Sequence, residues 1–317
     1  MRRLAIAIVL GLAAWPAAAA ADKPAAEAKP VFPPIAPPVD SSKVDLAFGA
    51  FQRGYYLTAF DEATKRVEEK QDPVAMTLLG QLYAEGLGVP RDPAKAASWY
   101  GLAAQRGNRD AIFAYGMAKV TGSGVPKDET GGILLLNKAA SMKVMAASYN
   151  LGILALRPVN GAPDFATALQ RFREAADEGS ADAEYSLGVL AKEGKGMPVD
   201  AKAAAGYFLA AAQDGNVDAM VETAIALYNG DGVPRDEKAA ALWFRRAAEA
   251  GSPIGRNRLA RLYASGQGVD KDPKMAGMWN LMAQAAGLRD PWLDDFMAGQ
   301  SQAVRDAALK AAQDHGL

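Results

Sequence analysis

The sequence contains no cysteine and only one histidine, His315, among its 317 residues. Without cysteine the chain forms no disulfide, no thiolate zinc site and no lipid-modified cysteine. A lone histidine near the C-terminus excludes Ser–His triads and histidine-rich metal sites. We therefore expect no enzyme: no catalytic residue, no cofactor and no metal. Carboxylate-only catalysis, as in glycosidases, stays open because no motif marks it, although no pair of acids stands out.

The chain also lacks an excess of either charge. Lysine and arginine number 35, and aspartate and glutamate number 36, so the formal net charge is −1. Loss of Arg2 and Arg3 with a cleaved leader would make it −3, because two cations would be lost. Proteins that bind nucleic acid need clustered positive charge to displace counterions from the phosphates. We therefore expect no nucleic-acid partner.

Residues 1–20 have the pattern of a secretory signal peptide. Arg2 and Arg3 precede the apolar stretch 4–14, and Ala18–Ala20 offers a small-residue cleavage site. We expect export to the bacterial periplasm, with no integral membrane segment left after cleavage. An uncleaved anchor is the alternative, but the apolar stretch is short for a membrane span.

Residues 21–43 form a segment rich in proline and alanine. Proline fixes φ and favours extended polyproline II, so we expect a semi-rigid linker. A peptide ligand for another module is the alternative. The prolines of this segment are Pro24, Pro30, Pro33, Pro34, Pro37 and Pro38.

A block of 36 residues recurs six times without insertion. One column of small residues reads Gly80, Gly116, Gly152, Gly188, Ala224 and Ala260. A second column is always aspartate: Asp92, Asp128, Asp164, Asp200, Asp236 and Asp272. A fixed period of this length is typical of stacked repeat arrays, which present extended binding surfaces.

The first full repeat predicts two helices. Asp72 caps the first, with Pro73 at its first position, and Gly86 ends it in the left-handed conformation. Asp92 then caps the second helix. The glycine in the middle of the first helix, Gly80, disfavours a helix by up to about 1 kcal/mol, so its recurrence predicts a close helix contact that a side chain would block.

The recurring residues resemble the Sel-1-like repeat family, relatives of tetratricopeptide repeats. The matching residues in the first copy are Leu79-Gly80, Tyr83, Gly86, Gly88-Val89, Asp92, Lys95-Ala96, Trp99-Tyr100 and Ala103-Ala104. The resemblance covers 72–287 in six copies. It implies an all-α fold, a right-handed α/α superhelical solenoid of helix pairs. It also implies adaptor or regulatory work through protein contacts, often in the bacterial envelope, without a catalytic site.

The flanks and one copy depart from the pattern. Residues 44–71 read as a degenerate N-terminal helical repeat, and 288–317 as a C-terminal capping helix that shields the last apolar face. In the third copy Pro158 stands where the first turn glycine should be, so we expect its first helix to end early. We expect the junction of copies two and three to be a bend or a contact point; neutral drift is the alternative.

The resemblance also suggests where a partner would bind. In tetratricopeptide repeats the groove is lined by the first helices, at set positions around the column glycine. Transferred to this chain, those positions are apolar in copies two to five and polar at both ends. We expect a protein or peptide partner at Phe113, Met117, Tyr149, Ile153, Tyr185, Val189, Val221 and Ile225. The alternative is that superhelical curvature buries these residues, or that the terminal helix covers them.

Together these features predict an exported, monomeric scaffold or adaptor that binds a protein or peptide in its concave surface. A periplasmic regulator of a signalling system is one version, since similar periplasmic members restrain the sensor domain of a membrane histidine kinase. The alternative is a structural envelope factor that organises peptidoglycan or surface-assembly enzymes. The sequence itself names no partner.

Overall fold

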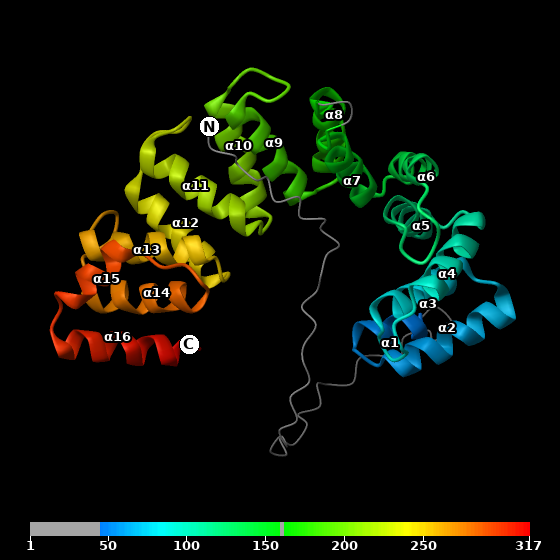
Figure 1. Cartoon of the computed structure of the whole chain (residues 1–317), viewed down its shortest axis with the longest axis horizontal. Coiled ribbons are helices and arrows are strands. Elements are labelled where there is room, and N and C mark those ends of the chain that lie inside the picture. The colour runs from blue at the N-terminus through cyan, green and yellow to red at the C-terminus, as the bar shows by residue number, and fades with distance from the viewer. Residues whose placement is uncertain (1–44, 159–161) are drawn as a thin grey trace, which may run out of the picture. The chain divides into compact units, whose positions relative to one another are not determined.

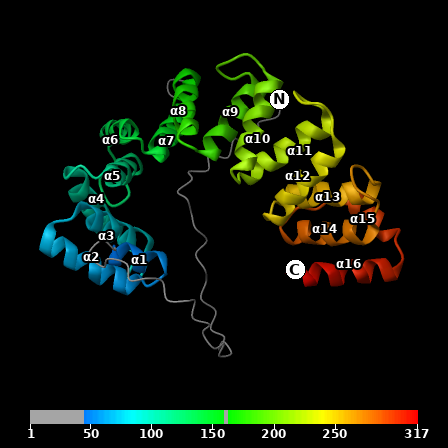
Figure 2. The ribbon, with the colours of Figure 1, turned by 180° about the vertical axis from the view of Figure 1, so that it is seen from behind.

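The computed structural model describes residues 45–158 and 162–317, and their regular structure consists of sixteen α-helices. The predicted signal peptide, 1–20, and linker, 21–43, lie outside the described residues. Figures 1 and 2 show the helices following one another in pairs, each pair beside its neighbours in the sequence. The predicted all-α solenoid is confirmed.

Six of the helix pairs recur at intervals of 36 residues. The first helices are α3 (Pro73–Glu85), α5 (Arg109–Thr121), α7 (Met145–Ala155), α9 (Ala181–Glu193), α11 (Val217–Asn229) and α13 (Pro253–Ser265). The second helices are α4 (Pro93–Gln105), α6 (Glu129–Ser141), α8 (Phe165–Asp177), α10 (Ala201–Gln213), α12 (Glu237–Glu249) and α14 (Pro273–Ala285). Before them come α1 (Leu46–Gln52) and α2 (Tyr56–Lys70), and after them α15 (Pro291–Ala298) and α16 (Gln302–Asp314).

Side-chain caps set where most of these helices begin. Each aspartate of the invariant column accepts a hydrogen bond from a backbone N–H in the first turn of its second helix. Such a cap stabilises a helix by about 1 kcal/mol. Five of the six first helices are capped in the same way, by Asp72, Asn108, Ser180, Asn216 and Ser252. The exception is α7, where Val144 provides no side-chain cap.

Three of the column glycines mark a close contact within a pair, as the sequence predicts. A Cβ atom added to Gly80, Gly152 or Gly188 would lie 2.6 Å from an aromatic ring of the second helix. Carbon atoms attract each other best at about 3.5–4.0 Å, so a side chain at these positions would force the helices apart. The rings belong to Tyr100, Phe172 and Phe208 respectively.

In most copies, the turn between the two helices of a pair contains two glycines, and the second of them lies at the contact with the preceding pair. Gly124 has φ +73°, and a Cβ atom there would lie 1.9 Å from the carbonyl oxygen of Pro93, at the start of the preceding second helix. Gly232 and Gly268 meet the preceding second helix in the same way. Glycine is therefore required twice over, by its left-handed backbone and by the close approach.

The third copy departs from this regularity. Helix α7 ends at Ala155, two residues before the position that the period assigns to its end, so the predicted early ending is confirmed. Pro158 explains it, because proline disfavours helical backbone in the residue before it and has no N–H to donate. Residues 159–161, which follow Pro158, lie outside the described residues.

The buried core divides into separate clusters of side chains in the third copy. One cluster runs from α1 to Leu151 in α7, and another begins at Ala168 in α8. Helix α7 contacts both, because Val144 and Ala147 lie in the first cluster and Ile153 packs against the second. The bend or contact point that we expect at the junction of copies two and three stays a prediction.

The C-terminal helix α16 packs against the last repeat. Ala308 and Ala312 of α16 are buried, and the helix packs along α14. A Cβ atom at Gly277 of α14 would lie 2.7 Å from the Cβ atom of Ala308, so this contact is also close. The rings of Trp279 and His315 meet edge to face with centroids 6.2 Å apart. The only histidine therefore takes part in packing.

Candidate partner-binding site

The eight predicted site residues lie on the first helices of copies two to five, α5, α7, α9 and α11; we call them the first-helix stripe. Seven of them are partly exposed, with their inner parts packed against the core. Val221 is the exception, because only 5% of its surface is accessible. Val221 belongs to the buried core cluster of the last repeats, whereas Val189, also a valine, is only partly buried. The stripe therefore has a gap on α11.

The two tyrosines of the stripe stand on rings of the second helices. Tyr149 packs on Phe172 with ring centroids 5.7 Å apart, and Tyr185 packs on Phe208 at 5.8 Å. Burial raises the pKa of Tyr149, and burial together with nearby acids raises the pKa of Tyr185 to about 12. Both phenols are neutral at physiological pH, so each presents a rigid, amphipathic surface without charge.

Polar contacts join successive first helices beside the stripe. Lys192 of α9 forms a 2.6 Å ion pair with Glu222 of α11. Asn216, the cap of α11, donates a 2.8 Å hydrogen bond to Asp182 of α9. These contacts hold α9 next to α11, so the partly exposed apolar side chains of neighbouring copies lie on one continuous face.

The stripe ends at the sixth copy, where the C-terminal segment covers the corresponding polar positions. Arg261 donates two hydrogen bonds, of 2.6 and 2.8 Å, to the carboxylate of Asp290, and Asn257 donates a third of 2.8 Å. These bonds, chiefly those from Arg261, lower the pKa of Asp290 to about 2. The Arg261 guanidinium also lies 5.0 Å from the ring centroid of Trp292. At this end, the groove positions are thus covered by the chain itself. The covering element is α15, which the sequence did not predict as a separate helix.

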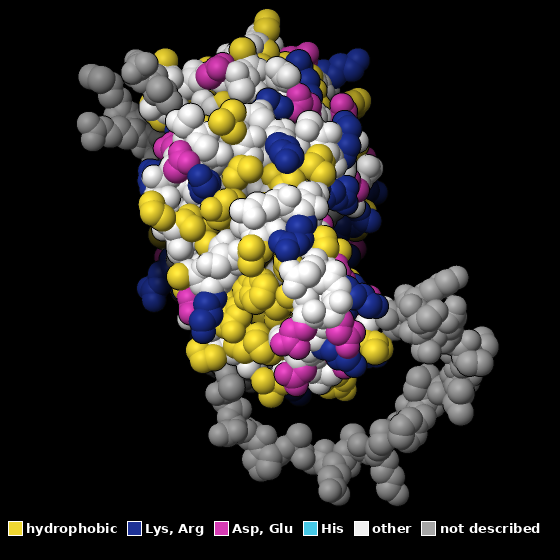
Figure 3. Space-filling view, turned by 90° about the vertical axis from the view of Figure 1, so that its right-hand side faces the viewer, with side chains coloured by type: hydrophobic (Ala, Val, Ile, Leu, Met, Phe, Trp, Pro, Cys, Tyr) yellow, Lys and Arg dark blue, Asp and Glu magenta, His cyan; other side chains and the backbone are white. Residues whose placement is uncertain are grey.

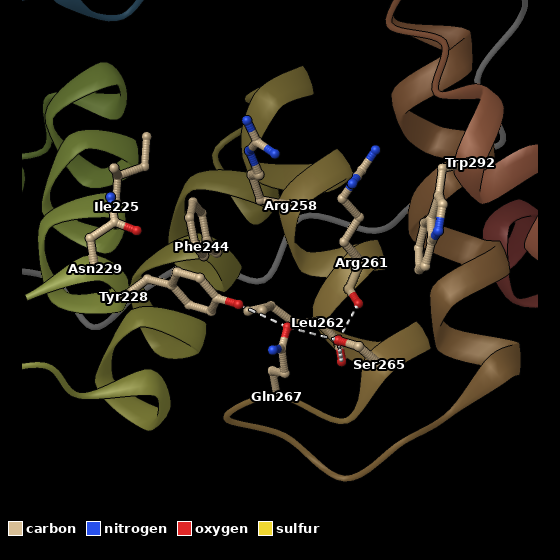
Figure 4. A pocket seen from close by; sticks show the side chains of 10 residues that line it. All are labelled: Ile225, Tyr228, Asn229, Phe244, Arg258, Arg261, Leu262, Ser265, Gln267 and Trp292. Atoms are coloured by element: carbon tan, nitrogen blue, oxygen red, sulfur yellow. Dashed lines mark hydrogen bonds between the residues drawn. The ribbon is translucent and has the colours of Figure 1, made fainter.

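A cavity of about 390 Å³ adjoins this covered end. Figure 4 shows its lining, which comes from the repeat helices α11 to α13, the turn after α13 and Trp292 of α15. Its residues are Ile225, Tyr228, Asn229, Phe244, Arg258, Arg261, Leu262, Ser265, Gln267 and Trp292. We call it the α11–α13 cavity. Ile225 is the one lining residue that was among the eight predicted site residues. Phe244, Gln267 and Trp292 could not be predicted from the groove positions, because they lie on a second helix, a turn and α15.

A second cavity, of about 810 Å³, lies at the irregular third copy. Arg157 crosses it to form a 2.6 Å ion pair with Glu129, and Arg171 donates a 2.6 Å hydrogen bond to Asn137. These contacts link α8 and the end of α7 to α6. The cavity borders residues 159–161, which the structure does not describe, so we assign it no role.

Other surfaces of the described part offer smaller features. Figure 3, which faces the N-terminal helices, shows hydrophobic side chains in separate groups among charged ones. Over 45–158 and 162–317 there is no group of three or more His, Asp or Glu side chains that could hold a metal ion. In the same ranges, every helix is too short or too polar to cross a membrane.

Solved structures share this architecture. The crystal structure of a Sel1 repeat protein from Oxalobacter formigenes aligns with a TM-score of 0.68 and 29% identity, over 76% of this chain and 98% of that one. The structure of c5321, a protective antigen of uropathogenic Escherichia coli with an SLR fold, aligns with a TM-score of 0.47 and 24% identity, over 82% of this chain and 64% of that one. The first of these supports the fold at the level of the whole repeat array.

One relative of known identity matches a part of the sequence. Chitin synthase regulatory factor 3 of Schizosaccharomyces pombe is 33% identical over 90 residues, which are 28% of this chain and 10% of that protein. The aligned part therefore spans about a tenth of that relative, and the similarity concerns a few repeats.

The family model described as "Sel1 repeat" matches residues 73–108, 109–144, 181–216, 217–252 and 253–285. The unmatched block, 145–180, is the third copy, whose cap and turn are both altered. Proteins built from Sel1 repeats generally act as scaffolds for protein interactions, and their fold is typically not catalytic. Since the five matched repeats make up more than half of the 317 residues, this chain belongs to the Sel1 repeat family.

Proposed function

We propose that this protein is an exported scaffold that binds a segment of another protein along the first-helix stripe. The observation that carries the proposal is the stripe itself. Apolar side chains recur at the same two positions of neighbouring first helices, and seven of the eight stay partly exposed. A row of this kind is uncommon on a soluble surface that has no partner.

The form of the stripe suits a peptide or an amphipathic helix. Phe113, Tyr149 and Tyr185 occupy one column, and aromatic residues held rigidly from below are frequent energetic anchors in protein interfaces. An amphipathic helix can place apolar side chains against such a row at intervals of three or four residues. The acids near Tyr185, Asp218 and Glu222, add a polar border to the apolar face.

The place and the purpose of the scaffold follow from other features. Residues 1–20 have the pattern of a cleaved leader, which supports export to the periplasm. A scaffold without catalytic groups acts by occupying or positioning its partner, and this suits a regulator of a signalling protein. The fission-yeast relative also carries the name of a regulatory factor, although its aligned part is short.

Photocrosslinking in cells tests this proposal. A photoreactive amino acid replaces Tyr149 or Tyr185, and mass spectrometry identifies the adducts. Replacement of Leu134, an exposed residue on the second helix α6, is the matched control. The proposal predicts one discrete foreign adduct from both stripe positions and none from Leu134.

The adducts also decide between forms of the function. A sensor domain as the adduct supports a signalling regulator, and a peptidoglycan enzyme supports a structural envelope factor. Crosslinks only within the chain would mean that the stripe binds no partner. Sequencing of the mature N-terminus tests export, since cleavage after Ala20 predicts a chain that begins at Ala21.

A further inference from the structure

We propose that the α11–α13 cavity binds an acidic peptide segment of the partner, with a carboxylate on Arg258 and a neighbouring apolar side chain between Tyr228 and Trp292. This inference rests on the proposed function, because it places one end of the bound segment. It adds the chemical nature of that segment, which the apolar stripe alone does not define.

The walls of the cavity combine apolar surface with positive charge. Ile225, Phe244, Leu262 and the rings of Tyr228 and Trp292 provide apolar surface, and no acidic side chain is among the lining residues described. A volume of about 390 Å³ lies within the range of ligand pockets, about 300–1,000 Å³. The cavity thus has room for one large side chain and attracts negative charge.

Arg258 is the group in the cavity that is available to an anion. Its side chain is exposed, and within 45–158 and 162–317 it forms no ion pair or hydrogen bond. It precedes Arg261 by three residues, so both side chains project from the same face of α13. Figure 4 shows the two guanidinium groups extending to the same side of the cavity. Arg261 is already engaged by Asp290, which leaves Arg258 for a partner.

The chain itself contains an example of the proposed contact. Asp290 accepts two hydrogen bonds from Arg261, and Trp292, two residues later, places its ring on the same guanidinium. Arginine favours this combination because its planar fork matches a carboxylate and its face stacks on an aromatic ring. An acid followed by a large apolar residue in the partner can repeat the arrangement on Arg258, against the exposed side of Trp292, which is 46% accessible.

The cavity is continuous with the first-helix stripe. Ile225 belongs to both, and Trp292 forms the far wall, so a segment that lies along the stripe reaches the cavity at its end. The charges along this route differ, since Asp218 lies near Tyr185 on α9, whereas Arg258 and Arg261 line the cavity. A difference in charge along a site favours one direction of a bound ligand. We infer that the acidic end of the partner segment points toward α13.

A random peptide library displayed on phage, selected against the purified full chain, tests the inference. Parallel selections use Arg258→Glu and, as a matched control, Arg173→Glu on the second helix α8, where the arginine is also exposed. Wild type and Arg173→Glu should enrich peptides that carry Asp or Glu beside an aromatic or aliphatic residue. The Arg258→Glu protein should lose this enrichment.

Binding of one enriched peptide in solution then measures the contact. Fluorescence anisotropy should show affinity about tenfold or more weaker for Arg258→Glu, the size expected for a lost hydrogen bond to a charged group. Changing the acid of the peptide to its amide should weaken binding to the wild type similarly, yet change binding to Arg258→Gln little. Equal melting temperatures of the variants establish that the fold is intact.

The outcomes separate this inference from the proposed function. Peptides that bind Arg258→Glu as well as the wild type, but fail to bind Val189→Lys, would leave the stripe as the binding site and overturn the role of the cavity. Peptides that depend on Arg258 alone would support the cavity and refute the stripe. Enrichment of basic peptides, or of none, would overturn the inference.

Discussion

Gly188 faces Phe208 so closely that the ring occupies the space of a side chain: an added Cβ atom would lie 2.6 Å from it. The same ring packs against Tyr185, with centroids 5.8 Å apart. The column glycine, the second-helix aromatic and the tyrosine of the first-helix stripe are therefore parts of one packing unit. A change at the column glycine is expected to reach the binding face.

This unit predicts opposite effects for two glycines of the same repeat. Gly188→Val should destabilise the protein by about 1–3 kcal/mol, the usual effect of overpacking. Gly206→Ala should stabilise it by about 0.5–1 kcal/mol, because Gly206 lies within α10 with no atom within 4 Å of its added Cβ, and alanine is the better helix former. Urea denaturation followed by circular dichroism measures both. An unchanged midpoint for Gly188→Val would refute the close contact.

We expect substitutions of the two valines of the stripe to have different effects, one on partner binding and the other on the stability of the fold. Val189→Lys should leave the melting temperature nearly unchanged, because a partly exposed lysine can extend its ammonium into water. It should weaken partner binding. Val221→Lys should unfold much of the array, because Val221 is buried and a buried unpaired charge is strongly unfavourable. Thermal melts and crosslinking yields of the two variants test this, and similar melts would contradict the gap on α11.

The contact between Arg261 and Asp290 predicts a dependence of stability on pH. The pKa of Asp290 is about 2 in the folded protein, below the value of 3.8 for a free aspartate. A lowered pKa adds stability that is present above about pH 4 and is lost as the pH falls through 2. Asp290→Asn keeps a side chain that can cap α15 but removes the charge. Its stability deficit relative to the wild type should therefore shrink between pH 4 and pH 2.

Urea midpoints of both proteins at pH 5, 4, 3 and 2 provide this measurement. A deficit that stays constant over the whole range would show that the charge of Asp290 is not the source of the stabilisation. A deficit that disappears above pH 4 would mean that the hydrogen bonds from Arg261 contribute little.

The aspartate caps predict a smaller, local effect. Asp200→Ala removes the 2.9 Å hydrogen bond from the N–H of Ala203 and should cost about 1 kcal/mol. Asp177→Ala is the control, since that exposed aspartate stands at the end of α8, where a negative charge has no favourable dipole. Hydrogen exchange at the first turn of α10 should rise in the first variant only. Equal exchange in both would mean that packing, and not the cap, holds this end.

Local signals account for the parts of the fold that the sequence predicts well. Caps such as Asp92, turn glycines such as Gly86 and the early end of α7 before Pro158 each depend on residues within one helical turn. The close contact at Gly80 was also predictable, because six aligned copies show which position tolerates only a small residue. The six copies within one chain thus serve the same purpose as an alignment of related sequences, which a protein without repeats would need for this prediction.

Contacts between distant residues account for what could not be predicted. The burial of Val221 depends on how far neighbouring side chains rise above the core. The bonds from Arg261 to Asp290 and the wall formed by Trp292 depend on where α15 folds back, since Asp290 follows Arg261 by 29 residues. By itself the sequence determined a Sel1-type array of helix pairs, because its caps, turns and small residues act locally and repeat every 36 residues. The tertiary structure alone decided which side chains of the stripe reach the surface and where the cavity with Arg258 lies. Both depend on packing between helices whose contacts cannot be read from the 36-residue repeat.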